Sequence, residues 1–195
     1  MSNTVITMEE PRTRLAMHPK KFALWLFIVS ITMLFAAFTS AYIVKASEGI
    51  VLDLTMPSLF KISTLIIILS SISMQWSLKS AKENEMKNTK LMLSTTFILG
   101  VTFLITQFMG WGQLVDQNVY FAGSNALASF IYVLTGLHAA HLISGVIFLL
   151  ITLLAAFNFK VHSKSMVLIQ MCTTYWHFLG GLWIYLFLFL TVNLN

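Results

Sequence analysis

Three histidines lie inside stretches of sequence that are otherwise almost wholly apolar, and they are the residues best placed to do chemistry. His138 and His141 are three positions apart, which puts both on one face of a helix, and His177 follows in the next apolar stretch. Imidazole rings can ligate a metal ion or haem iron, or they can hydrogen-bond between helices without any cofactor. An ionisable group inside a membrane is a candidate functional residue in either case.

The donors around these histidines do not make a complete ligand set. Zinc takes four ligands, and the only other soft donor nearby is Cys172, which helical geometry turns away from His177. Because Cys172 is the one cysteine, it can form no intrachain disulfide. We therefore expect no metal, no cofactor and no catalytic residue in this chain, and histidines that bind lipid or contact other helices. The acidic residues all lie outside the apolar stretches, at Glu9, Glu10, Glu48, Asp53, Glu83, Glu85 and Asp116.

The elements that would position the histidines are membrane-spanning helices. The chain is 57% hydrophobic and only 10% charged, far from the composition of a soluble domain. About 20 apolar residues cross a hydrocarbon core as a helix. The sequence predicts an all-α bundle with a tail at 1–21 and a transmembrane domain at 22–195, with helices at 22–44, 59–78, 91–111, 129–156 and 168–192.

Basic residues indicate the orientation of this bundle. Ten of the twelve lysines and arginines lie before the first helix or in the second and fourth connections. The positive-inside rule then places the N-terminus in the cytoplasm and the C-terminus outside. The net charge of +5 follows from this bias, and no nucleic-acid motif accompanies it, so we expect no nucleic acid as a partner.

Small residues recur on the helix that carries His138. Gly136, Ala140 and Ser144 follow one another at intervals of four, and Gly145 adds to them. Such a ridge lets another helix approach closely, so we expect these four residues to pack against one.

Two motifs resemble the subunit III family of haem-copper terminal oxidases. Residues 135–145, TGLHAAHLISG, are similar to the family's "TGxHxxHVxxG" helix, and residues 175–183, YWHFLGGLW, to its closing "YWHFVDxVW" helix. Upstream, Trp25–Ser30 and Met33–Ala36 are similar to its "WLFxxSExMxFxG" helix, and Glu85 and Gln107 fall where the family has similar residues.

This resemblance covers nearly the whole chain and implies the five-helix bacterial form of a non-catalytic subunit. Such a subunit packs on subunit I, holds phospholipid between its helices, and supports proton uptake, oxygen access and stability. Haem and copper would belong to subunits I and II, with further small subunits or a respiratory supercomplex as additional partners. A cleft for lipid or a neighbouring helix would then be lined by His138, His141, Tyr175, Trp176 and His177.

The chain departs from the family pattern where the family has carboxylates. Ile31 replaces its membrane glutamate, Gly180 replaces the aspartate after "YWHF", and 108–113 lacks the acidic residues of a "QxxEYxE"-like run. Three alternatives stay open: the same subunit in a quinol oxidase, a free-standing haem- or metal-binding membrane protein using the three histidines, and a small transporter or channel. The last is disfavoured by the absence of intramembrane carboxylates and of internal repeats.

Overall fold

The computed structural model describes residues 19–48, 58–121, 126–158 and 166–193, and these form five long helices. Each is long and apolar enough to cross a membrane, which confirms the predicted all-α transmembrane bundle. The helices extend past the predicted limits by up to five residues, because flanking polar residues such as Lys79 and Lys82 continue the last turns. Their bounds are α1 (Pro19–Ala46), α2 (Ser58–Lys82), α3 (Met86–Asp116), α4 (Ala126–Phe157) and α5 (Val167–Asn193).

The predicted N-terminal tail falls mostly outside this description. Residues 1–18 lie beyond the described part of the chain, and 19–21 form the first turn of α1. Proline suits that first turn because its missing N–H would have no partner there.

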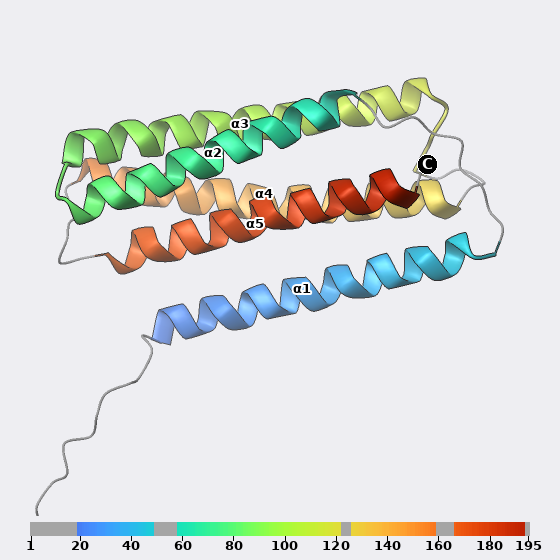
Figure 1. Ribbon diagram of the computed structural model, residues 1–195, viewed down its shortest axis with the longest axis horizontal. Coiled ribbons are helices and arrows are strands. Elements are labelled where there is room, and N and C mark those ends of the chain that lie inside the picture. Colours follow the sequence, from blue (N-terminus) through green and yellow to red (C-terminus); the bar gives the residue numbers. More distant parts are fainter. Residues whose placement is uncertain (1–18, 49–57, 122–125, 159–165, 194–195) are drawn as a thin grey trace, which may run out of the picture.

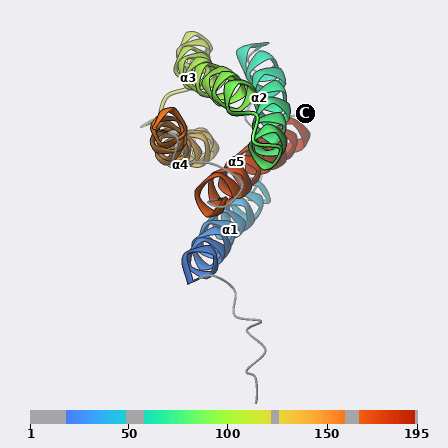
Figure 2. The ribbon, with the colours of Figure 1, turned by 90° about the vertical axis from the view of Figure 1, so that its left-hand side faces the viewer.

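Four of the helices form a closed ring, and the fifth lies beside it. Helix α2 contacts α3 and α5, and α4 completes the ring by contacting α3 and α5. Helix α1 contacts only α4 and α5 among the described residues, and Figure 2 shows α5 lying between α1 and α2. Successive helices run in opposite directions along the bundle (Figure 1).

Hydroxyl groups on α2 hold the α2–α3 side of the ring together. Ser77 Oγ donates to the Thr89 carbonyl over 3.2 Å, and Ser73 Oγ to the Met92 carbonyl over 2.9 Å. Deeper in the bundle, Gln107 Nε2 donates to Ser63 Oγ over 2.9 Å. Small hydroxyl side chains allow close approach and hydrogen-bond between helices where hydrophobic driving force is weak.

Candidate functional site

His138 lies in the interior of the ring. Its side chain is fully buried, and its ring centroid is 5.3 Å from that of Trp183 and 6.2 Å from that of Phe103. Neither ring nitrogen has a hydrogen-bond partner in the described part of the chain. His138 is thus a buried residue of α4 that packs against aromatic side chains of α3 and α5.

His141, one turn along the same helix, faces α1 instead. Its ring centroid is 5.9 Å from that of Phe35 and 6.4 Å from that of Phe27. The Nδ1 atom donates to the Leu137 carbonyl over 2.7 Å, since a carbonyl oxygen can only accept. In the neutral ring this leaves Nε2 as a hydrogen-bond acceptor at the junction of α1 and α4.

Tyr175 joins His141 at this junction. Its hydroxyl is 2.8 Å from Ser144 Oγ and 3.4 Å from the His141 carbonyl, and its ring centroid is 5.8 Å from that of Phe27. Ser144 Oγ donates to the same carbonyl over 2.6 Å. His141, Ser144 and Tyr175 therefore form one polar cluster, covered by aromatic side chains of α1.

Trp176, although adjacent to Tyr175, is part of the ring's core. It is 1% exposed, and its indole Nε1 donates to Ser70 Oγ over 2.9 Å. Trp183 repeats the arrangement two turns on, where Nε1 donates to Thr64 Oγ1 over 3.0 Å. Both indoles satisfy their N–H groups on α2, as buried tryptophan requires.

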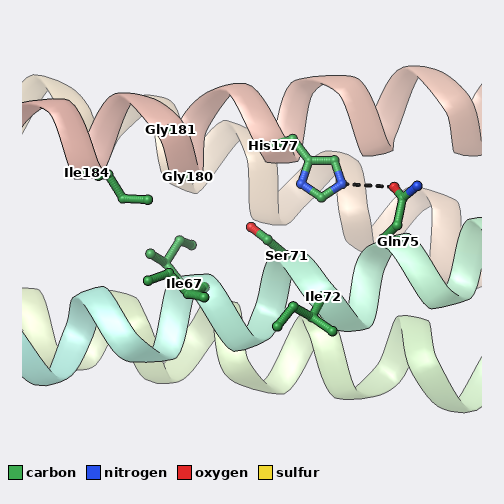
Figure 3. Close-up of a pocket in the computed structure, with 9 residues that line it drawn as sticks. Ile67, Ser71, Ile72, Gln75, His177, Gly180, Gly181 and Ile184 are labelled. Carbon is green, nitrogen blue, oxygen red and sulfur yellow. Dashed lines mark hydrogen bonds between the residues drawn. The ribbon is translucent and has the colours of Figure 1, made fainter.

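His177 points to the opposite side of α5 from Tyr175, toward α2. Its Nε2 donates to Gln75 Oε1 over 3.3 Å, and both side chains line a groove of about 410 Å³ between α2 and α5. Figure 3 shows the imidazole and the amide meeting across this groove, near Ser71 and Gly180.

The five residues predicted to share one cleft therefore occupy three places. His141 and Tyr175 come together beside α1, His138 and Trp176 lie in the core, and His177 lies in the groove against α2. That they line a lipid or helix-contact cleft stays a prediction. The described residues contain no group of three His, Cys, Asp or Glu side chains close enough to hold a metal ion.

The four small residues of α4 also divide between two environments. A Cβ on Gly145 would lie 2.6 Å from Leu179 Cδ1, so this glycine permits the close contact of α4 with α5. A Cβ on Gly136 would have nothing within 4 Å, and Ala140 and Ser144 are exposed. Gly136 and Ala140 therefore face away from the rest of the described chain, whereas Ser144, although exposed, hydrogen-bonds to Tyr175 of α5.

The sequence alone predicts no function for two residues of this groove, Ser71 and Gln75. Each is a single polar residue in an apolar helix, which ordinary packing explains as well as function does. Their spacing could have indicated a shared polar surface, because Ser71, Gln75 and Lys79 are four residues apart and therefore lie on one face of α2.

Comparison with known proteins decides the family. The family model described as Cytochrome c oxidase subunit III matches residues 5–193. The chain belongs to the cytochrome c oxidase subunit III family. Its predicted membership is confirmed over nearly the whole chain, including the helices that carry His141 and His177.

Relatives of this subunit III chain serve oxidases with two kinds of electron donor. It is 28% identical over 179 residues to cytochrome bo(3) ubiquinol oxidase subunit 3 of Buchnera aphidicola subsp. Schizaphis graminum, covering 89% of this chain and 94% of the relative. It is 28% identical over 193 residues to cytochrome c oxidase subunit 3 of Myxine glutinosa, covering 93% and 72%. The same protein of Bacillus sp. (strain PS3) is 25% identical over 173 residues, covering 86% and 83%.

Proposed function

We propose that this chain is the non-catalytic subunit III of a haem-copper terminal oxidase, working in aerobic electron transport to oxygen. The match to the subunit III family over residues 5–193 carries the proposal. The geometry supports it, because His138, His141 and His177 point into the core, toward α1 and toward α2. Haem and copper would be held by partner subunits I and II.

The proposed membrane is the bacterial plasma membrane, with the N-terminus in the cytoplasm. Two of the relatives named above are bacterial and are matched over most of their length. Within the described chain, one end of the bundle carries most of the lysines, at Lys20, Lys21, Lys79, Lys82, Lys87 and Lys90. The positive-inside rule assigns that end to the cytoplasm.

The outward-facing residues Gly136 and Ala140 are the proposed contact with a transmembrane helix of subunit I. These residues are exposed or face open space, so a partner backbone could approach α4 closely. Leucines substituted at Gly136 and Ala140 should lower co-purification of subunit I without unfolding the chain, whereas Leu at Gly112, which also faces open space on α3, should leave it unchanged.

Phospholipid is the proposed ligand of the apolar surface around α5. A groove of about 440 Å³ lies between α1 and α5 and is lined by Thr32, Phe35, Ala36, Phe178, Gly181, Leu182 and Tyr185. An acyl chain suits such a lining because the groove offers few polar atoms.

A quinol oxidase is the second candidate, since the relatives include both types. Donor specificity belongs to the other subunits, so reduced cytochrome c and a quinol must be compared as substrates of the purified complex. A complex oxidising only the quinol would assign this chain to a quinol oxidase.

Removing this chain from the cell tests the proposed supporting role. Membranes that lack it should keep the oxidase haem spectrum, because the haems belong to other subunits, but should lose oxygen-consumption activity faster during turnover. Unchanged activity over many turnovers would contradict the proposed role.

A further inference from the structure

The polar cluster of His141, Ser144 and Tyr175 lies deep in the membrane. His141 is at the middle of α4, which has 32 residues and runs from Ala126 to Phe157. Because the hydrocarbon core is about 30 Å thick and such a helix is longer, its middle lies near the centre of the core. Water is absent there, so a polar atom without a protein partner carries the full cost of its desolvation.

Every polar hydrogen of this cluster is already donated within the chain. His141 Nδ1 donates to the Leu137 carbonyl over 2.7 Å, and Ser144 Oγ donates to the His141 carbonyl over 2.6 Å. The Tyr175 hydroxyl, 2.8 Å from Ser144 Oγ, then donates to that oxygen. The cluster has no donor left, and its main free capacity is the lone pair of His141 Nε2 in the neutral ring.

The Nε2 atom of His141 can be reached from outside the chain. The imidazole is partly exposed, and Nε2 is not one of the buried side-chain atoms that lack a hydrogen-bond partner. No described side chain donates to it. On the side of α1 the ring meets Phe27 and Phe35, and the buried Ile31 between them on that helix offers no donor either.

Small residues surround this acceptor on the outward face of α4. Ala140 and Ser144 are exposed, and a Cβ on Gly136 would meet nothing within 4 Å. Figure 2 shows α4 at the outer edge of the ring, so no other described helix lies beyond this face. The backbone of a further helix can approach closely here, within reach of His141.

We propose that a transmembrane helix of subunit I packs along α4 over Gly136 and Ala140 and donates a hydrogen bond to His141 Nε2. The donor is a hydroxyl, an amide or an indole N–H at the middle of the membrane. The proposal rests on the proposed function and deepens it, since it names the atom that receives the partner and the chemistry that the partner brings.

The hydrogen-bonding capacity of the cluster selects this occupant. A lipid acyl chain has no donor and would leave Nε2 unpaired. A second copy of the chain that presented the same face would bring another Nε2 acceptor against the first. A helix of a different chain that carries a donor satisfies the nitrogen, and its other polar backbone groups are satisfied within the helix itself.

Two variants of His141 test the acceptor in the assembled oxidase. His141→Phe keeps an aromatic ring beside Phe27 and Phe35 but removes Nε2. The ratio of subunit I-bound to free chain under a detergent challenge should fall about threefold, the effect of an average hydrogen bond between membrane helices. His141→Gln, whose side-chain carbonyl can take the place of Nε2 as an acceptor, should restore most of the binding.

The comparison of these two variants separates the acceptor from packing. Equal retention of the His141→Phe and His141→Gln chains, whether high or low, would overturn the proposal, because the acceptor is the property that distinguishes them. His177→Leu, on the other side of the molecule in the groove against α2, should leave retention at the wild-type level.

Photo-cross-linking in native membranes identifies the occupant directly. A small diazirine-bearing amino acid is incorporated at position 140, and the products are analysed by mass spectrometry. The expected product joins this chain to one transmembrane helix of subunit I, and the same probe at position 112 on α3 should not give it. Products with lipid alone, or with a second copy of this chain, would overturn the proposal.

The same membranes distinguish a failure of this proposal from a failure of the proposed function. If subunits I and II co-purify with the chain but the probe at position 140 labels lipid alone, the docking site is wrong and the subunit III assignment stands. If no haem-copper subunit co-purifies, the proposed function fails and the docking site fails with it.

Discussion

The ring of α2–α5 and the outlying helix α1 are held by different means. Helices α1 and α5 are similar in length, with 28 and 27 residues, yet α1 has only five buried residues whereas α5 has eleven. The ring pairs indole and amide donors with hydroxyls of α2, whereas α1 is held by a narrow, mainly aromatic stripe and by Lys21 Nζ donating to Gln170 Oε1 over 2.7 Å. A helix that buries so little of itself leaves most of its surface for lipid or another subunit.

The largest expected effect of a single substitution lies at the centre of the ring. Trp176→Ala removes a fully packed indole and leaves the Ser70 hydroxyl without its donor, so the free energy of unfolding should fall by about 3–5 kcal/mol. Trp76→Ala, at an exposed position on α2, should change it by less than about 0.5 kcal/mol. Thermal unfolding of the two variants in the same detergent measures the contrast, and equal losses would contradict it.

Disrupting the close contact between α4 and α5 should have the next largest effect on the free energy of unfolding. Gly145→Val places a Cβ 2.6 Å from Leu179 Cδ1, so the helices must separate, at a cost of about 1–3 kcal/mol. Gly136→Val, on the outward face of the same helix, provides the control for lower helix propensity. The unfolding midpoint of Gly145→Val should lie below that of Gly136→Val, and the reverse order would show that α4 packs by its other face.

Replacing His138 should act in the opposite direction. The imidazole is buried without a hydrogen-bond partner in the described chain, so His138→Leu should raise the free energy of unfolding by about 1 kcal/mol. His177→Leu should not stabilise the chain, because the His177 ring is paired with Gln75. A clear loss of stability in His138→Leu would reveal a polar partner for this ring.

The smallest effect is expected at the attachment of α1. Tyr185→Phe removes the hydrogen bond from Tyr185 Oη to Thr39 Oγ1, which spans 3.1 Å and should contribute about 0.6 kcal/mol. The loss should loosen α1 and leave the ring intact. Disulfide trapping between cysteines at Leu24 and Met171 should become slower, while trapping between α2 and α3 should keep its rate.

The fold was predictable from the sequence because membrane-spanning helices need a length and an apolarity that the sequence itself carries. All five helices follow from that requirement, and only their ends differ. Lys79 and Lys82 extend α2 past the apolar limit because long side chains can reach the headgroup layer from inside a helix.

The site was less predictable, because which way a side chain faces depends on its neighbours. His138 and His141 share a face by spacing, yet the first enters the ring beside Trp183 and the second meets Phe35 of α1. The small-residue ridge shows the same limit, since Gly145 packs inside the chain while Gly136 faces outward. The spacing in the sequence shows which residues share a helix face, but what each of them contacts depends on how the helices pack.

Purification through this chain in mild detergent tests its assignment to a terminal oxidase most directly. Mass spectrometry identifies the co-purifying subunits, and optical spectra are recorded for the complex and for the separated chain. We predict that haem-copper subunits I and II co-purify and that the separated chain is colourless. A chain that purifies alone and carries a visible absorption band would show that its histidines are ligands, and would contradict the subunit III assignment.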